Sequence, residues 1–145
     1  MERRGLARAV LRASGLALMA AGAIHLIATP EIPHLLDGLS PKARSLAIGP
    51  TLLNHVLVGI LLVPLGFTTW MAATGHSYLR QTWARPVIIV NSLAAFALPL
   101  TLVLFIGQPD YRAPLFLAAA ALTVLAAVSI PIGALIGGST TSAPG

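Results

Sequence analysis

Long apolar runs alternate with short polar stretches along this chain. Four runs contain no Asp, Glu or Lys and no Arg except Arg12 at one edge; they cover residues 11–29, 52–73, 87–107 and 115–137. Each has about 20 residues, which as a helix at 1.5 Å per residue crosses a hydrocarbon core of about 30 Å. A segment in lipid must satisfy its own backbone hydrogen bonds, so each run predicts a helix. The pattern predicts an all-α, integral membrane four-helix bundle over residues 1–137, with a short disordered tail at 138–145.

Prolines mark the ends and interiors of these runs. Pro86 and Pro114 stand where the third and fourth helices are expected to begin, a position at which a missing N–H costs nothing. Pro64, Pro99 and Pro131 lie inside three of the runs, and each removes one backbone hydrogen bond. Small residues in the first run, Gly15 and Gly22 among them, favour close approach to a neighbouring helix.

Composition supports a membrane location and argues against nucleic acid as a partner. Hydrophobic residues make up 57% of the 145 positions and charged residues only 9%, whereas a soluble domain has about 25% charged residues. The net charge is +5, but no basic face with interleaved aromatic residues is present to follow phosphates. The expected partner is the lipid bilayer, with a larger membrane complex or a homo-oligomer as further options.

The distribution of positive charge predicts the orientation. One side of the predicted bundle has more Lys and Arg than the other: Arg3, Arg4, Arg8, Arg12, Arg80 and Arg85 against Lys42, Arg44 and Arg112. By the positive-inside rule both termini are cytoplasmic, in a bacterial-type inner or plasma membrane. Trp70, Tyr78 and Trp83 are then expected to anchor the cytoplasmic interface.

The loop between the first two runs has its own pattern. Ser40 is a candidate helix N-cap, Pro41 follows it, and apolar and basic residues then fall on different sides. This pattern predicts a short amphipathic helix in the first outer loop, lying at the membrane surface as an anchor or as a lid.

The strongly polar side chains within the apolar runs are the candidates for function, because polar groups are costly in a bilayer. His25 lies five residues before Pro30 and His55 five residues after Pro50, so both are expected about 7 Å below the outer surface, facing each other. His34 and Glu31 are expected directly above them, with Asn54 and Asp37 in support. Asn91 is expected in the other half of the bundle, apart from this cluster.

Three interpretations of the cluster stay open. His25, His55, His34 and Glu31 could bind a transition metal, or the two intramembrane histidines could be the axial ligands of haem b. A quinone site is a further option. Alternatively the histidines only fix the packing of the first two helices, in a structural or assembly subunit.

No feature of the sequence assigns an enzymatic reaction. The chain has no cysteine, which excludes disulfides, thiolate metal ligands and iron–sulfur clusters. No nucleophile and base pair or nucleotide-binding loop is recognisable. Catalytic residues are therefore not predicted, and the question of an enzyme stays open.

The basic N-terminus, the first run ending in "AAGAIHLIATPE", the outer loop and the four predicted helices resemble the DoxX-like small membrane proteins. The resemblance implies either an accessory subunit of a quinone-linked oxidoreductase or a protein whose function is unknown. Cysteines of some redox-linked members are absent here, so no thiol role and no catalytic residue carries over.

A competing interpretation of the N-terminus is a secretory signal peptide, because a basic start precedes an apolar run. Cleavage would remove His25. The segment "LIATPEIP" is a poor cleavage region and the run is long, so retention is expected.

Overall fold

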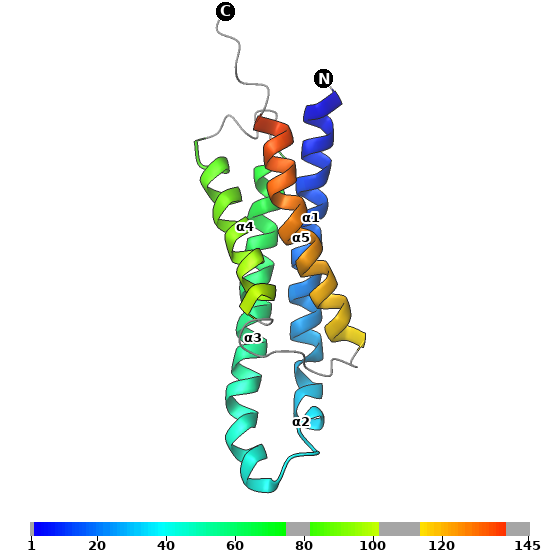
Figure 1. Cartoon of the computed structure of the whole chain (residues 1–145), viewed down its shortest axis with the longest axis vertical. Coiled ribbons are helices and arrows are strands. Elements are labelled where there is room, and N and C mark those ends of the chain that lie inside the picture. Colours follow the sequence, from blue (N-terminus) through cyan, green and yellow to red (C-terminus); the bar gives the residue numbers. More distant parts are fainter. Residues whose placement is uncertain (1, 75–81, 102–113, 139–145) are drawn as a thin grey trace, which may run out of the picture.

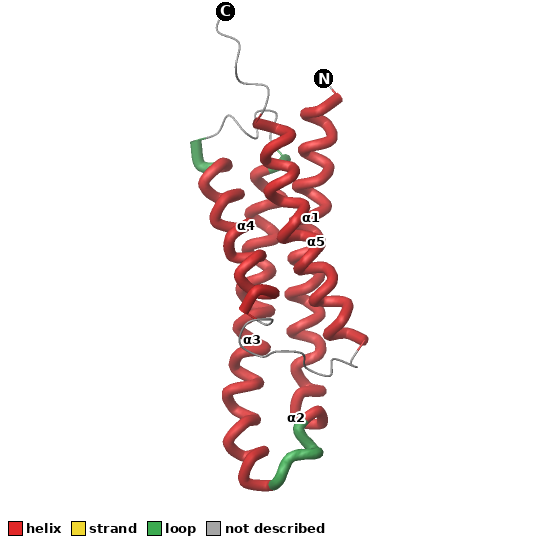
Figure 2. The backbone as a smooth tube through the Cα atoms, in the orientation of Figure 1, coloured by secondary structure: helices red, strands yellow, loops and turns green. Residues whose placement is uncertain are grey.

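The computed structural model describes residues 2–74, 82–101 and 114–138. Within these ranges the chain is all-α and has no strand (Figure 2). The long helices are α1 (Glu2–Ala28), α3 (Pro41–Ala72), α4 (Ala84–Thr101) and α5 (Pro114–Gly138). A 3-10 turn, η1 (Thr29–Glu31), and the single turn α2 (Ile32–Leu35) connect α1 to α3.

The long helices lie side by side as a bundle, with the N-terminus and the end of α5 at the same end (Figure 1). Among the described residues, four helical segments are long and apolar enough to cross a membrane. The predictions of an all-α fold and of four such helices are therefore confirmed. α1 and α3 extend beyond α4 and α5 at the other end, where α2 lies (Figure 1).

The first two long helices, α1 and α3, begin well before the predicted runs, and α3 begins at Pro41 instead of residue 52. α1 begins at Glu2 instead of residue 11, because Ala7 and Leu11 are fully buried and extend the packed face of the helix. α5 matches the predicted fourth run to within one residue at each end. Residues 102–107 of the predicted third run and residues 139–145 of the predicted tail lie outside the described ranges.

The first outer loop does not contain a separate amphipathic helix, so that prediction is wrong. The segment is helical and begins as predicted, with the Ser40 hydroxyl accepting a hydrogen bond from the Ala43 N–H at 3.4 Å. However, the helix continues without a break through Pro50 to Ala72. A proline removes only one backbone hydrogen bond from the turn before it, and here that loss does not end the helix.

Four glycines form a seam where the backbones of α1 and α3 approach each other. Gly15 faces Gly66 and Gly22 faces Gly59. A Cβ added at Gly66 would lie 2.5 Å from the Gly15 carbonyl oxygen, and one added at Gly22 would lie 2.8 Å from that of Gly59. On each helix, the two glycines of the seam are seven residues apart. That spacing keeps the seam on one face of two antiparallel helices.

An adjoining face of α1 packs against α5. The hydroxyls of Ser14 and Ser129 share a hydrogen bond of 2.5 Å, and the Ser14 hydroxyl also donates to the Val10 carbonyl. A Cβ at Gly133 would meet the side chain of Leu11 at 2.9 Å. α1 is therefore the central helix, in close contact with both α3 and α5.

A buried amide joins α4 to α3. Asn91 is 4% exposed, and its Nδ2 atom lies 2.9 Å from the Thr68 hydroxyl, 2.8 Å from the Thr69 hydroxyl and 3.0 Å from the Leu65 carbonyl. Buried polar groups are stable only when they are hydrogen-bonded. As expected from its position in the sequence, Asn91 lies apart from the histidines.

We expect Gly66→Ala to destabilise the bundle by about 1–3 kcal/mol, because the new methyl group collides with the α1 backbone. The matched control is Gly49→Ala in the same helix, where a Cβ meets nothing within 4 Å and alanine favours the helix. Circular dichroism during SDS titration in mixed micelles measures both. Equal stabilities for the two variants would contradict the seam.

Asn91→Ala is expected to lower the free energy of unfolding by about 1 kcal/mol, a typical value for polar contacts between helices in membranes. Asn54→Ala, at an exposed position of α3, should change it by less than about 0.5 kcal/mol. The same titration compares the two variants. If Asn91→Ala lowers the free energy of unfolding no more than Asn54→Ala does, the proposed link between α3 and α4 is ruled out.

Candidate functional site

The glycine seam places the two histidines of α1 and α3 against each other. His25 follows Gly22 by three residues and His55 precedes Gly59 by four, so each histidine lies on the same helix face as its glycine. The ring centroids are 4.7 Å apart and the ring planes are inclined by 36°. The sequence predicts that these imidazoles face each other, and the structure places them in contact.

The His25 ring is fixed by its own helix. Its Nδ1 atom lies 2.9 Å from the Ala21 carbonyl oxygen, one turn earlier. A carbonyl oxygen only accepts hydrogen bonds, so Nδ1 must be the donor. In the neutral ring Nε2 then carries the lone pair. His25 therefore presents an acceptor, with its orientation set by a backbone hydrogen bond.

The His55 ring is in a less favourable environment than the His25 ring. Its Nε2 atom is buried and has no hydrogen-bond partner among the described residues. The backbone of His25 lies near enough to this ring to interact with it electrostatically. A buried polar atom without a partner costs about 1–3 kcal/mol. Such a cost is more typical of a binding site than of a residue that serves packing alone.

A cavity of about 300 Å³ adjoins the histidine pair. All four long helices line it: His25 comes from α1, Asn54 and His55 from α3, Thr101 from α4 and Thr123 from α5. The remaining wall is apolar and includes several alanines. The two threonine hydroxyls donate to backbone carbonyls of their own helices, Ala97 and Ala119. The polar groups that face a ligand are therefore the two imidazoles, the Asn54 amide and the threonine oxygens, which can still accept a hydrogen bond.

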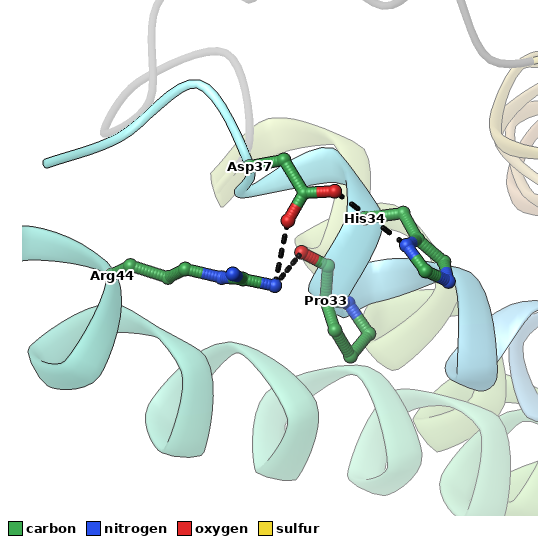
Figure 3. Close-up of polar contacts among 4 residues, drawn as sticks. All are labelled: Pro33, His34, Asp37 and Arg44. Carbon is green, nitrogen blue, oxygen red and sulfur yellow. Dashed lines mark hydrogen bonds and ion pairs between the residues drawn. The ribbon is translucent and has the colours of Figure 1, made fainter. Parts of the chain in front are cut away.

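The loop residues predicted to complete the cluster lie elsewhere. His34 Nδ1 is 3.6 Å from Asp37, and Asp37 is 2.6 Å from an Arg44 nitrogen that also donates to the Pro33 carbonyl at 3.2 Å (Figure 3). This network joins the end of α2 to the first turns of α3, and Glu31 is exposed beside it. The prediction that His34, Glu31 and Asp37 converge on His25 and His55 is wrong, because the continuous α3 helix carries its N-terminal end away from the pair.

The distance between the two imidazole rings limits which kind of metal site the pair could form. Two axial ligands of one haem iron would have ring centroids about 6 Å apart, since each nitrogen lies about 2.0 Å from the metal. Rings in contact at 4.7 Å leave no space for a porphyrin between them. A single ion bound by both rings from one side requires about 5 Å, close to the observed separation. In the part of the chain that is described, no three His, Asp or Glu residues form a metal-binding group.

The three residues predicted to be membrane anchors are only partly described. Trp70 ends the glycine seam, where its backbone N lies 2.8 Å from a Cβ added at Gly15, and its ring stacks on Phe67. Trp83 is 42% exposed just before α4. Tyr78 lies outside the described residues, and the anchoring role itself stays a prediction.

Sequence reasoning missed the second half of the glycine seam and the cavity. Gly59 and Gly66 have the same seven-residue spacing as Gly15 and Gly22. This shared spacing is the signal in the sequence that could have predicted the seam. The cavity had no such signal, because it depends on how four helices meet.

No family model, curated protein or solved structure matches the chain. The resemblance to DoxX-like proteins therefore stays a prediction. The described part of the chain is defined by its all-α fold, with four potential membrane-spanning helices and a cavity lined in part by two histidines.

Nitrogen-15 solid-state NMR of the histidine-labelled protein in lipid tests the fixed tautomer. We expect His25 to be the Nδ1–H form because of the Ala21 carbonyl. The His25→Ala variant assigns its signal. An Nε2–H form at His25 would contradict the proposed orientation.

Proposed function

We propose that this chain is an integral membrane protein that binds a small amphipathic molecule in the cavity beside His25 and His55. Support for insertion comes from the apolar surface of the four long helices, where large side chains such as Ile27, Leu93 and Leu135 are 66–74% exposed. Such a surface is unfavourable in water and suited to lipid.

The proposed orientation places both chain ends in the cytoplasm of a bacterial-type cell. Arg4, Arg8, Arg12 and Arg85 belong to the end of the bundle where α1 begins and α4 begins. Lys42 and Arg44 are the basic residues described at the opposite end, so the first end has more of them. This distribution follows the positive-inside rule and puts the histidine cavity near the outer membrane face.

The observation that carries the proposal is the composition of the cavity wall. A mainly apolar cavity of about 300 Å³ with a few polar groups in its wall is typical of a small-molecule site. The His25 Nε2 lone pair accepts a hydrogen bond from a hydroxyl, and Val58, Leu62 and Leu98 offer an apolar surface to a ring. A hydroxylated aromatic headgroup, such as that of a hydroquinone, matches both features.

A decyl-substituted benzohydroquinone is the probe for this site, with its affinity measured by calorimetry in detergent. We expect His25→Ala to weaken binding about tenfold, because loss of one hydrogen bond of about 1.4 kcal/mol has that effect. Ala120→Phe, which fills the cavity, should abolish binding, and His34→Ala should leave it within twofold. Loss of binding in His34→Ala, or full binding in Ala120→Phe, would place the probe elsewhere.

A transition metal at the histidine pair is the second candidate. A metal-binding histidine usually donates its other ring N–H to a carbonyl or carboxylate, and His25 donates Nδ1–H to Ala21 in this way. Two neutral imidazoles and the Asn54 amide oxygen would provide the donor atoms.

Elemental analysis and an optical spectrum of the purified protein separate the candidates. A stoichiometric metal that is lost in both His25→Ala and His55→Ala, with the hydroquinone unbound, would replace the first proposal by the second. A Soret band would contradict the ring geometry. A protein that binds neither species would leave the histidines with helix packing as their role.

A further inference from the structure

A second hollow lies at the opposite end of the bundle, between α4 and α5. Its volume is about 370 Å³, and its wall is apolar except for the Ser92 hydroxyl and the guanidinium of Arg85. The Ser92 hydroxyl donates to the Ile88 carbonyl of its own helix at 2.7 Å. Arg85 is thus the one lining group that is available to a charged ligand.

The sequence explains why the helices leave space here. Ser92 on α4 and Pro131 and Ala134 on α5 are small and form the floor. Ile89 and Leu135 form the rims and are 58% and 74% exposed. The result is a groove on the outer surface of the bundle, on a side that the proposed insertion turns toward lipid.

Arg85 stands at one end of this groove. It is the second residue of α4, and the exposed Trp83 precedes it by two positions. Within residues 2–74, 82–101 and 114–138 no carboxylate forms an ion pair with Arg85, since the ion pairs there involve Asp37. From Arg85 the groove continues to Leu93, eight residues along the helix, or about 12 Å.

A neighbouring hollow between the same two helices provides a comparison. It has a volume of about 260 Å³ and is lined by Phe96, Pro99, Leu100, Val124, Ala127 and Val128. None of these side chains is charged, so this neighbouring hollow offers only an apolar surface to lipid tails. The groove at Arg85 differs because a cation lies at its end, at the level where phospholipid headgroups begin.

We propose that the groove between α4 and α5 binds one anionic phospholipid, with the lipid phosphate at Arg85 and an acyl chain along Ile89, Leu93 and Leu135. Arginine binds phosphate in a planar, bidentate geometry. Each basic residue near a membrane surface contributes about 1 kcal/mol toward anionic lipid, roughly a fivefold preference. The proposal requires membrane insertion but does not depend on what the histidine cavity binds.

Native mass spectrometry tests the proposal on protein in detergent with equal amounts of phosphatidylglycerol and phosphatidylcholine of the same chain length. We expect one bound lipid with about fivefold preference for phosphatidylglycerol. Arg85→Gln should remove the preference, and Arg85→Lys should retain part of it. The control is Arg12→Gln, a basic residue at the same end that is hydrogen-bonded to the Thr74 carbonyl and should keep the preference.

Filling the groove tests the position of the acyl chain. Ala134→Phe should reduce binding of both lipids, whereas Ala121→Phe, at an exposed position of α5 outside the groove, should not. Inorganic phosphate at 10-fold excess should fail to displace the lipid, because it lacks the apolar part. Equal losses in Arg85→Gln and Arg12→Gln, displacement by phosphate, or unchanged binding in Ala134→Phe would each overturn the proposal.

Discussion

The close approach of the α1 and α3 backbones is the constraint that fixes the other contacts. Glycines at 15, 22, 59 and 66 let each backbone enter the space that side chains would otherwise fill. In the proposed membrane environment, which provides no strong hydrophobic driving force between helices, such close packing supplies much of the association energy. It also fixes the register, because a shift of even one residue would put larger side chains at the seam.

The functional geometry follows from that register. His25 and His55 come within 4.7 Å because each lies about one turn beyond a seam glycine. α5 packs against an adjoining face of α1, and α4 is joined to α3 through Asn91. Beyond Asn91, the alanines at 94, 97 and 120 fill little of the space between the helices, and the cavity lies there. Small residues therefore account both for the contact between the two histidines and for the cavity beside them.

Particular residues show how far the sequence could predict this arrangement. The lengths of the apolar runs predict all four long helices, and the equal distances of His25 and His55 from Pro30 and Pro50 predict their contact. The same proline argument fails for the segment between α1 and α3, because Pro50, from which the depth of His55 is counted, lies inside a helix that begins at Pro41. As a result His34 and Asp37 pair with Arg44 instead of joining the histidines. The cavity and the groove at Arg85 depend on side chains from several helices, which periodicity along one helix does not describe.

Cysteine cross-linking across the seam tests the central claim, that the glycine register brings positions 25 and 55 together. The chain has no native cysteine, so His25→Cys combined with His55→Cys can be oxidised in native membranes and analysed by gel mobility. Leu53, an exposed residue of α3, provides the control pair with His25→Cys. The account predicts rapid cross-linking for positions 25 and 55 and little for 25 and 53. Equal rates for the two pairs, or faster cross-linking at 53, would contradict it.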